Sequence, residues 1–344
     1  SDKHIGETVT LCGWVHTRRD HGGLIFVDLW DKYGMTQVVL NPQIDQLAHE
    51  HAQSIRGNYV IGIVGDVRAR PDDMINQKLK TGMIEVYVDE LSILNPSETP
   101  PISPWETKET SEALRLKYRF LDLRGPELQR NLKMRYDITR VARNELHRNG
   151  FMEIETPMLT KSTPEGARDY LVPSRLNTQK FYALPQSPQL FKQILMVSGM
   201  DRYYQIVKCF RDEDLRNDRQ PEFTQIDIEM SFDNEKTLFQ MTEEMMAAIY
   251  QEVLDVKIET PFPLLKYQDA IDRFGTDKPD MRFGMEIVDL GEIVRGTAFK
   301  VFAQVLESGG QVRALNVKNS AEILSRKALD DLTEIAKTYG AKGM

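Results

Sequence analysis

The chain has 344 residues and a mass of 39.6 kDa, a length that predicts at least two domains. Charged residues make up 28% of it and hydrophobic residues 41%, which excludes a largely disordered, collagen-like or coiled-coil protein. The net charge of −8 argues against a nucleic-acid partner, but residues 115–225 hold 20 basic and 14 acidic side chains. That segment is therefore either a solvated surface or the site of a polyanionic ligand.

Cysteine usage and hydropathy indicate the compartment. Only Cys12 and Cys209 occur, each within a strand-like run and far apart in the sequence, so neither a disulfide framework nor a cysteine metal site is expected. The histidines lack partners at metal-binding spacing, so we predict no metal site within this sequence. No apolar run approaches the roughly 18 residues of a membrane span, and the first residues do not resemble a secretory signal. We expect a soluble, cytoplasmic protein without a membrane partner.

Residues 1–95 are predicted to form one all-β module. Alternating apolar residues mark three strands joined by glycine-containing turns, followed by a short amphipathic helix and two further strands. This order is that of a five-stranded OB-fold barrel, whose open face commonly binds single-stranded nucleic acid or oligosaccharide. The expected strands are residues 9–15, 24–29, 35–40, 59–67 and 83–88.

The composition changes after this module. Residues 96–112 hold four prolines, which favour an extended backbone, so we predict a hinge or linker there. Residues 113–279 then alternate helical and strand-like segments, and residues 280–344 suggest a further α/β piece. The expected segments of the middle part are a helix ending at Asn149-Gly150, a strand at 151–155, a helix at 188–199, strands at 203–211 and 223–232, and a helix at 235–254.

Two stretches of the middle part match known motifs when they are taken together. The helix before Gly150 runs into GFMEIETP at 150–157, and RDEDLR at 211–216 separates two strands and is closed by PEFTQ at 221–225. Alone, the first is a common helix–strand unit and the second a common solvated hairpin. In this order they resemble motifs 1 and 2 of the class II aminoacyl-tRNA synthetases, in which motif 1 forms the dimer interface and motif 2 holds ATP.

Two longer stretches narrow this resemblance. TPEGARDYLVPSR at 163–175 and YALPQSPQLFK at 182–192 are similar to bacterial-type aspartyl-tRNA synthetases. The resemblance implies an α+β multidomain protein in which the barrel precedes a class II antiparallel-sheet catalytic domain. It also implies an aspartate–tRNA ligase that uses ATP and Mg²⁺ and acts on L-aspartate and tRNA-Asp. Whether tRNA-Asn is a second substrate stays open. A homodimer would form through the helix at 127–149 and the strand ending at Pro157.

The chemistry of amino-acid activation explains the residue types at the implied ATP site. Activation brings the carboxylate of aspartate against the α-phosphate of ATP, so the site must neutralise both reactants. Arg211 is the expected catalytic residue, because its planar guanidinium can bind phosphate and carboxylate together. By resemblance, Glu213 accepts from the adenine amino group and Phe223 stacks on the adenine, an ordinary core aromatic being the alternative for Phe223. Asp212 and Gln220 complete the implied ATP site.

Recognition of the aspartate side chain requires a cation, and Lys192 matches the family position that supplies it. At about 4 Å and an effective dielectric constant of about 20, one opposite charge is worth on the order of 4 kcal/mol before desolvation. Asparagine would forfeit most of that energy. The alternative for Lys192 is a solvated helix residue, because lysine is rarely buried. The resemblance places further residues around the amino acid, namely Glu165 on a mobile loop, Ser187, Gln189, Arg211 and Asp227.

The resemblance places the tRNA anticodon on the barrel face. Phe26 would stack on the central anticodon base, as aromatic side chains of such barrels do. His21, in a turn beside that strand, resembles the residue of relaxed enzymes that also charge tRNA-Asn; the alternative is an exposed turn residue without RNA contact. The module itself is acidic, since residues 1–100 hold 9 basic and 14 acidic side chains. The other implied anticodon contacts are the base-reading residues Gln37, Arg56 and Glu85 and the backbone-binding residues Arg18 and Arg19.

One expected part of a class II site has no counterpart here. Motif 3, with its γ-phosphate arginine and acidic Mg²⁺ ligands, is not found after Phe232. Residues 280–344 resemble the start of the domain that bacterial aspartyl enzymes insert between motifs 2 and 3, so we expect the sequence to end inside that insertion and to be inactive alone.

Two alternatives to the aspartyl enzyme were weighed. Asparaginyl and lysyl enzymes share the barrel and motifs 1 and 2 but lack the EGARD run at 165–169. A non-catalytic OB-fold RNA-binding relative is the other alternative, against which Arg211, Glu213 and Lys192 argue because all three are intact.

Overall fold

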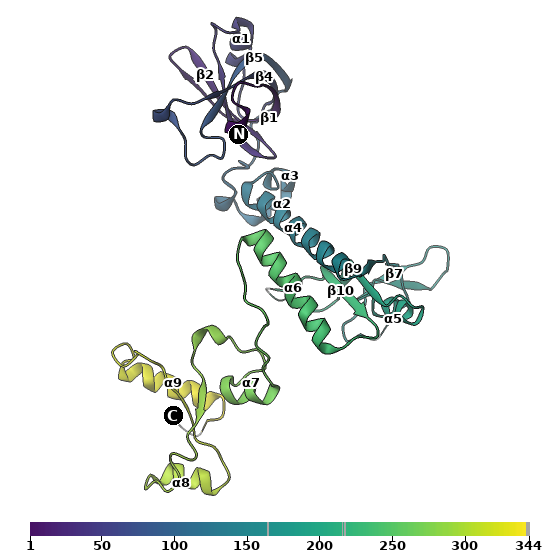
Figure 1. Cartoon of the computed structure of the whole chain (residues 1–344), viewed down its shortest axis with the longest axis vertical. Helices are drawn as coiled ribbons and strands as arrows, with labels where there is room; N and C mark the ends of the chain where they lie inside the picture. The colour runs from purple at the N-terminus through teal and green to yellow at the C-terminus, as the bar shows by residue number, and fades with distance from the viewer. Residues whose placement is uncertain (164, 215, 217, 342–344) are drawn as a thin grey trace. The chain divides into compact units, whose positions relative to one another are not determined.

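The computed structural model describes residues 1–163, 165–214, 216 and 218–341 (Figure 1). The chain divides into two compact units, residues 1–140 and residues 141–344, and each is described by itself. Across the described ranges, no helix is long and apolar enough to span a bilayer.

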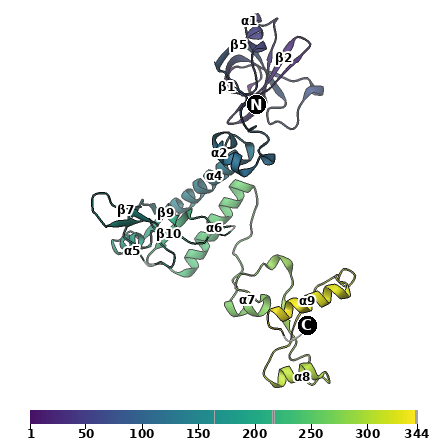
Figure 2. The ribbon, with the colours of Figure 1, turned by 180° about the vertical axis from the view of Figure 1, so that it is seen from behind.

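The first unit contains a closed five-stranded barrel. The strand order is β1-β2-β3-β5-β4, with antiparallel neighbours except for the parallel β3–β5 pair. The predicted OB-fold topology is confirmed. Helix α1 (Gln46–Gln53) begins at Asp45, whose side chain accepts from the backbone N–H of Ala48, and it covers one end of the barrel, where it contacts β2, β3 and β5 (Figures 1 and 2). The strands are β1 (Thr8–His21), β2 (Leu24–Asp31), β3 (Gly34–Leu40), β4 (Val60–Ala69) and β5 (Ile84–Asn95).

Alternation along the strands separates the barrel core from its outer surface. On β2, Ile25, Val27 and Leu29 are at most 2% exposed and belong to the core cluster. Because successive side chains of a strand point to opposite faces, Phe26 and Asp28 lie on the outer surface. The outer surface can therefore carry polar and aromatic residues without disturbing the core.

The predicted linker, residues 96–112, is attached to the barrel. The ring of Trp105 packs against Trp30 and His16, with centroid distances of 4.6 and 4.7 Å. A short 3₁₀ turn, η3 (Thr107–Glu109), follows. This attachment is a feature that the proline content alone does not indicate, because it depends on an aromatic contact with strands distant in sequence.

A small helical segment connects the barrel to the long helix. It consists of α2 (Glu112–Lys117) and α3 (Arg119–Asp122), followed by α4 (Pro126–Arg148). The carboxylate of Asp122 is fully buried and accepts hydrogen bonds from Arg115 and Arg119. Helix α4 ends as predicted, since Gly150 adopts a left-handed conformation with φ +76°.

The second unit is built on a three-stranded sheet in the order β10-β9-β6. The two long predicted strands are confirmed as the antiparallel pair β9 (Arg202–Phe210) and β10 (Glu222–Met230), and helix α5 (Gln189–Val197) packs against both. The predicted strand at 151–155 is shorter, because only β6 (Met152–Glu153) pairs, in parallel, with β9. A hairpin of β7 (Leu171–Pro173) and β8 (Phe181–Ala183) is a separate two-stranded sheet.

Helix α6 (Glu235–Leu254) has the predicted bounds. Its start is marked by Asn234, whose side chain accepts from two backbone N–H groups of the first turn, and it ends at Asp255 in a left-handed conformation. The buried residues Met241, Met245 and Ile249 recur every four positions and form its apolar face.

The last part of the chain has the α/β character predicted for residues 280–344, but it includes a helix, α7, that lies before residue 280. Strands β11 and β12 pair in antiparallel fashion, and helix α7 contacts β11. The elements are α7 (Tyr267–Phe274), the 3₁₀ turn η4 (Met281–Phe283), β11 (Ile287–Asp289), α8 (Lys300–Glu307), β12 (Arg313–Leu315) and α9 (Arg326–Thr338). Two further 3₁₀ turns, η1 (Asp2–His4) and η2 (Asp72–Met74), lie in the first unit.

Candidate active site and nucleic-acid interface

One face of the β9–β10 pair gathers the candidate active-site residues. Alternation along β10 places Phe223, Asp227 and Glu229 on the same face. The antiparallel register sets Phe223 opposite Cys209 and Asp227 opposite Gln205. Residues from motif 2 and from the strand that follows it therefore share one surface.

Lys192 on α5 reaches this face and is paired with two carboxylates. Its Nζ lies 2.8 Å from Asp227 Oδ1 and 3.3 Å from Glu229 Oε2, and the residue is 9% exposed. Burial lowers the pKa of the ammonium, but the hydrogen bond and charge of Asp227, helped by Glu229, raise it by more, so the net pKa lies above its usual range. Lys192 is therefore a buried, charged lysine, not the solvated helix residue that was its alternative. Glu229 was not predicted, although its position two residues after Asp227 on one strand is a signal for it.

Asp227 has one unused oxygen. Its Oδ2 is buried, and within the described ranges no hydrogen-bond partner reaches it. A buried carboxylate oxygen without a donor is costly, so a bound ligand that carries an N–H group or an ammonium would stabilise this arrangement.

Arg211, directly after β9, combines an aromatic contact with an unused donor. Its guanidinium lies 5.2 Å from the centroid of the Phe223 ring. Its Nε is buried, and no acceptor for it occurs in the part of the chain that the structure describes. A partly exposed cation beside an aromatic ring suits a ligand with an anionic group and a planar ring, as a nucleotide has.

The loop at 165–169 is tied to this site by Gln186. Its side-chain amide donates to the backbone oxygen of Ala167 at 2.9 Å, accepts from the Ala167 N–H at 3.1 Å, and also donates to Asp169. Burial alone would raise the pKa of Asp169, but hydrogen bonds from Gln186 and Ser162 lower it, and the net pKa is below its usual range. Gln186 is only 2% exposed and was not predicted as a functional residue. A polar residue inside the run YALPQSPQLFK was the available signal.

Further contacts link the loop to its neighbours. Ser187 Oγ donates to Glu165 Oε2 at 2.8 Å and accepts from the Gln189 N–H at 3.3 Å. The backbone N–H of Asp212 donates to the Arg168 oxygen at 3.0 Å. The loop is thereby connected to motif 2 and to the start of α5.

The Cys209 thiol reports how closely the candidate charges approach one another. Its pKa is raised to about 11, chiefly by burial, with the charges of Asp227 and Glu165 adding to the rise and those of Arg211 and Lys192 opposing it. The direct contacts among the predicted residues join Lys192 to Asp227, Arg211 to Phe223, and Ser187 to Glu165.

The outer residues of the implied ATP site are less organised. Glu213 is exposed and its Oε2 lies 3.8 Å from Arg219, a distance at which an exposed ion pair contributes little. Gln220 is also exposed, and Asp212 contacts the loop only through its backbone. These three positions remain predictions.

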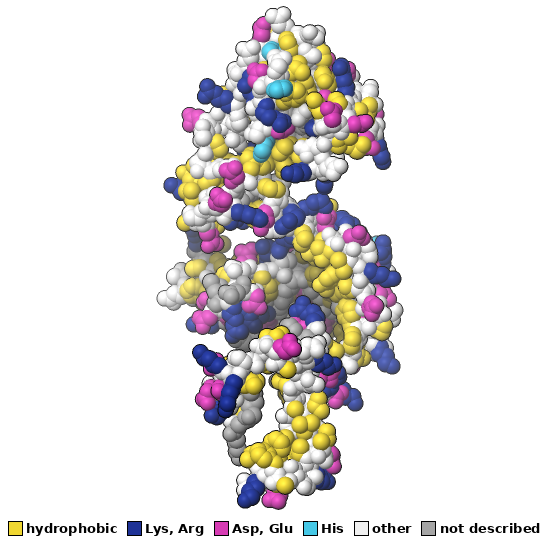
Figure 3. Space-filling view, turned by 90° about the vertical axis from the view of Figure 1, so that its left-hand side faces the viewer, with side chains coloured by type: hydrophobic (Ala, Val, Ile, Leu, Met, Phe, Trp, Pro, Cys, Tyr) yellow, Lys and Arg dark blue, Asp and Glu magenta, His cyan; other side chains and the backbone are white. Residues whose placement is uncertain are grey.

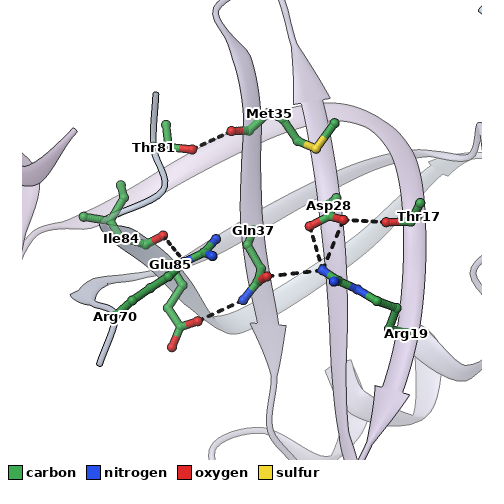
Figure 4. Close-up of polar contacts among 9 residues, drawn as sticks. All are labelled: Thr17, Arg19, Asp28, Met35, Gln37, Arg70, Thr81, Ile84 and Glu85. Carbon is green, nitrogen blue, oxygen red and sulfur yellow. Dashed lines mark hydrogen bonds and ion pairs between the residues drawn. The ribbon is translucent and has the colours of Figure 1, made fainter. Parts of the chain in front are cut away.

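The barrel surface carries a second cluster, a chain of hydrogen bonds across the four strands β1, β2, β3 and β5 (Figure 4). Gln37 donates from Nε2 to Glu85 Oε2 at 3.0 Å and accepts from Arg19 at 3.2 Å. Arg19 also donates to both oxygens of Asp28, at 3.0 and 3.1 Å, and Thr17 donates to Asp28. Three of the predicted anticodon residues are therefore connected through Gln37, and Asp28, which was not predicted, anchors Arg19 at the end of the chain. Its outward position two residues after Phe26 was the available signal.

The remaining predicted anticodon residues have different surroundings. Phe26 is partly exposed on β2, opposite Arg19, whereas Arg18 turns toward α1 and donates from Nε to the Ala52 oxygen at 2.9 Å. His21, the last residue of β1, and Arg56 are both exposed. On the face drawn in Figure 3, acidic and basic side chains are interspersed with hydrophobic ones over the barrel.

Mg²⁺ does not fit a cluster in this part of the chain. Among the residues that the structure describes, there is no group of three or more His, Cys, Asp or Glu side chains that could hold a metal ion.

Two family models match the chain. The OB-fold nucleic acid binding domain model matches residues 9–94, and the model of tRNA synthetases class II (D, K and N) matches residues 111–334. The chain therefore belongs to the class II tRNA synthetases of the D, K and N family.

Curated relatives indicate which synthetase of this family the chain resembles. The chain is 59% identical over 340 residues to the "Aspartate--tRNA(Asp/Asn) ligase" of Desulfotalea psychrophila, covering 99% of this chain and 56% of that protein. It is 55% identical over 345 residues to the "Aspartate--tRNA ligase" of Bacillus licheniformis, covering all of this chain and 58% of that protein. The resemblance to bacterial-type aspartyl-tRNA synthetases is confirmed. The chain spans just over half the length of the curated relatives it matches.

Solved structures agree on the fold. The crystal structure of asparaginyl-tRNA synthetase from Pyrococcus horikoshii complexed with asparaginyl-adenylate matches with a TM-score of 0.63 and 24% identity, over 74% of this chain and 56% of that one. A putative aspartyl-tRNA synthetase from Leishmania major matches with a TM-score of 0.62 and 21% identity, over 74% of this chain and 51% of that one. At these identities the similarity shows the fold alone.

Proposed function

We propose that the whole protein is an aspartate–tRNA ligase that activates L-aspartate with ATP and transfers it to tRNA. The observation that carries this proposal lies at the β9–β10 pair, where Lys192 is buried and charged and the buried Nε of Arg211 has no acceptor among the described residues. Two cationic side chains at this sheet suit two anionic reactants. The names of the curated relatives support aspartate as the amino acid.

The residues have distinct roles in the proposed reaction. The Lys192 ammonium binds the side-chain carboxylate of aspartate, and the free Asp227 oxygen and Glu165 receive its α-ammonium. Arg211 binds the α-carboxylate and the α-phosphate of ATP, which brings their atoms together and offsets their mutual repulsion. The α-carboxylate oxygen forms a bond to the α-phosphorus, the bond from that phosphorus to the bridging oxygen breaks, and pyrophosphate leaves with the electron pair. Phe223 stacks on the adenine, and Ser187, Gln189, Asp212, Glu213 and Gln220 line the two substrates.

Isotope exchange tests this proposal. The whole protein should exchange pyrophosphate into ATP with aspartate and not with asparagine or lysine, because only aspartate offers a carboxylate to Lys192. Exchange driven by asparagine or lysine would contradict the amino-acid assignment. RNA binding without any exchange would favour the non-catalytic RNA-binding relative instead.

The proposed nucleic-acid partner is tRNA-Asp, with tRNA-Asn as a second substrate. The connected side chains of Arg19, Gln37 and Glu85, next to the partly exposed Phe26, support an anticodon site on the barrel, with Arg18, His21 and Arg56 at its edges. Several relatives named for both tRNAs support the second substrate, while the Bacillus relative is named for one.

We further propose that the whole protein is a homodimer. Helix α4 exposes Leu132 and Tyr136 at 54% and 62%, and β6 exposes Met152 at 57%, which are large apolar side chains on the two segments that resemble motif 1. Light scattering of the whole protein at micromolar concentration should give twice the monomer mass. A monomer would contradict this proposal.

Residues 1–344 alone are proposed to be inactive in exchange, because no motif 3 was found in this sequence and the Mg²⁺ ligands that ATP chemistry requires would come from elsewhere. Aspartate-dependent exchange by a purified 344-residue protein would contradict this.

A further inference from the structure

The outer face of the barrel carries a second aromatic position. The register pairs Phe26 of β2 with Val39 of β3, and Val39 with Tyr87 of β5. Val39 is fully buried yet lies outside the barrel core cluster, which agrees with a position on the outer face beneath flanking side chains. Phe26 and Tyr87 thus lie in one row, two strands apart, a separation of roughly 10 Å at ordinary strand spacing.

Tyr87 is held in a defined orientation. The guanidinium of Arg68 lies 4.2 Å from the centroid of its ring. Burial raises the pKa of the Tyr87 hydroxyl, and the charge and hydrogen bond of Glu85 raise it further, with Arg68 acting in the opposite direction. The hydroxyl therefore stays protonated. The backbones of β4 and β5 approach closely at this point, which requires glycine at position 65, because a Cβ there would lie 2.1 Å from the Tyr87 carbonyl oxygen.

Arg68 is exposed, and its guanidinium remains available for an anion. It lies on β4 opposite Glu85 in the register, and its described contact is the stacking on Tyr87. A guanidinium stacked on an aromatic ring binds nucleic acids well, because it can contact a phosphate at its edge and a base at its free face. The pair thus combines the two elements of single-stranded RNA binding, a stacking surface and a cation.

We propose that Tyr87 and Arg68 form a second nucleotide subsite, which holds the base and phosphate of a loop nucleotide next to the one at Phe26. This inference rests on the proposed function, since it requires RNA on the barrel face. It goes beyond the anticodon residues predicted from the sequence, which include neither residue. The row Phe26–Val39–Tyr87 gives the RNA loop two stacking positions, and the hydrogen-bonded chain of Asp28, Gln37 and Glu85 runs beside it.

Binding of an RNA stem–loop with the aspartate anticodon to the 344-residue chain tests the subsite. Tyr87→Leu should weaken binding about tenfold, because leucine covers Val39 but offers no ring, whereas Tyr87→Phe should bind like wild type. Arg68→Gln should weaken binding and reduce the slope of log K against log salt concentration by about one. The matched control is Tyr33→Leu, which removes a ring stacked with Lys32 at 4.7 Å in the β2–β3 turn and should have no effect.

Abasic substitution on the RNA locates the subsite, because a loss of binding caused by general destabilisation of a protein variant would not depend on which nucleotide lacks its base. Each loop nucleotide is replaced in turn by an abasic residue. When the nucleotide at one loop position is abasic, Tyr87→Leu should no longer weaken RNA binding. Phe26→Leu should no longer weaken binding when a different loop position is abasic. If Tyr87→Leu weakens binding at every abasic position, the subsite is overturned and the proposed function is left intact. The same holds if the Tyr87→Leu chain binds like wild type while Phe26→Leu is impaired. Absence of RNA binding by the wild-type chain overturns both.

Discussion

Lys192 Nζ lies 2.8 Å from Asp227 Oδ1, while Asp227 Oδ2 is buried and, in the described part of the chain, has no partner. The two residues come from a helix and a strand and are held in contact by the packing of α5 on the sheet. The pair therefore presents a cation and a free carboxylate oxygen at one place. An amino acid with an anionic side chain and an ammonium group is complementary to both.

The first prediction concerns this cation. In the whole protein, Lys192→Met should lower kcat/KM for aspartate in pyrophosphate exchange by at least about 100-fold, since removal of one partner from a buried ion pair typically costs about 3 kcal/mol or more. The control is Lys208→Met, which breaks the exposed Lys208–Glu222 pair at 2.6 Å and should change the rate less than about fivefold. If the two substitutions lower kcat/KM for aspartate equally, Lys192 does not bind the aspartate substrate.

The second prediction uses the Cys209 thiol as a reporter of the site. Its pKa is raised from 9.0 to about 11, so between these values the folded state keeps a proton that the unfolded state loses, and this group makes the protein less stable as pH rises above 9. Alkylation requires the thiolate. At pH 8.5 iodoacetamide should modify the exposed Cys12 and leave Cys209 unmodified until the chain is unfolded, as measured by peptide mass spectrometry. Comparable labelling of both cysteines in the folded chain would contradict the burial of this face.

The third prediction separates orientation from charge on the barrel. Asp28→Asn removes a negative charge near RNA, so total affinity for an anticodon stem–loop should not fall at low salt. Discrimination against a changed central anticodon base should nevertheless fall about tenfold, because Arg19, which donates to the base-reading Gln37, loses the carboxylate that orients it. Asp31→Asn is the control, since it removes the same charge but preserves an acceptor for the turn N–H groups. Loss of affinity without loss of discrimination would count against this role.

The fourth prediction concerns tRNA choice. His21→Leu in the whole protein should reduce charging of tRNA-Asn about tenfold and leave tRNA-Asp charging unchanged, because a single base contact is worth roughly 1 to 3 kcal/mol and histidine can donate or accept a hydrogen bond. Initial rates on both tRNAs provide the measurement, with an unrelated tRNA as the baseline. If the wild-type protein charges tRNA-Asn at that baseline, the relaxed assignment is wrong, and His21 is then the exposed turn residue that was its alternative.

Local sequence predicted the elements that local forces determine. The bounds of α6 follow from Asn234, which satisfies the first backbone N–H groups, and from apolar residues at helical spacing. The end of α4 follows from Gly150, which adopts a left-handed conformation at little cost. The strand at 151–155 was predicted too long, because strand length depends on the partner, and β9 pairs with only two of its residues.

The motif resemblance also predicted a chemical role for individual residues. The structure adds the neighbouring side chains with which these residues interact, which the motifs do not include. Lys192 and Arg211 were predicted from such motifs, but the burial of Lys192 and the unused donor of Arg211 depend on packing around them. Gln186 was overlooked, because its role is to bond a backbone segment 19 positions away.

The sequence by itself thus determined the order of elements, the barrel class, the family resemblance and the identity of the charged residues at the site. Only the tertiary structure decided which of these residues meet. The clearest case is the barrel surface, where Asp28, Gln37 and Glu85 are brought into contact by the register of three strands, and Tyr87 is brought into the row of Phe26 by the parallel β3–β5 pairing. The physical reason is that helix caps and alternation depend on residues a few positions apart, whereas strand register depends on long-range pairing that no single segment encodes.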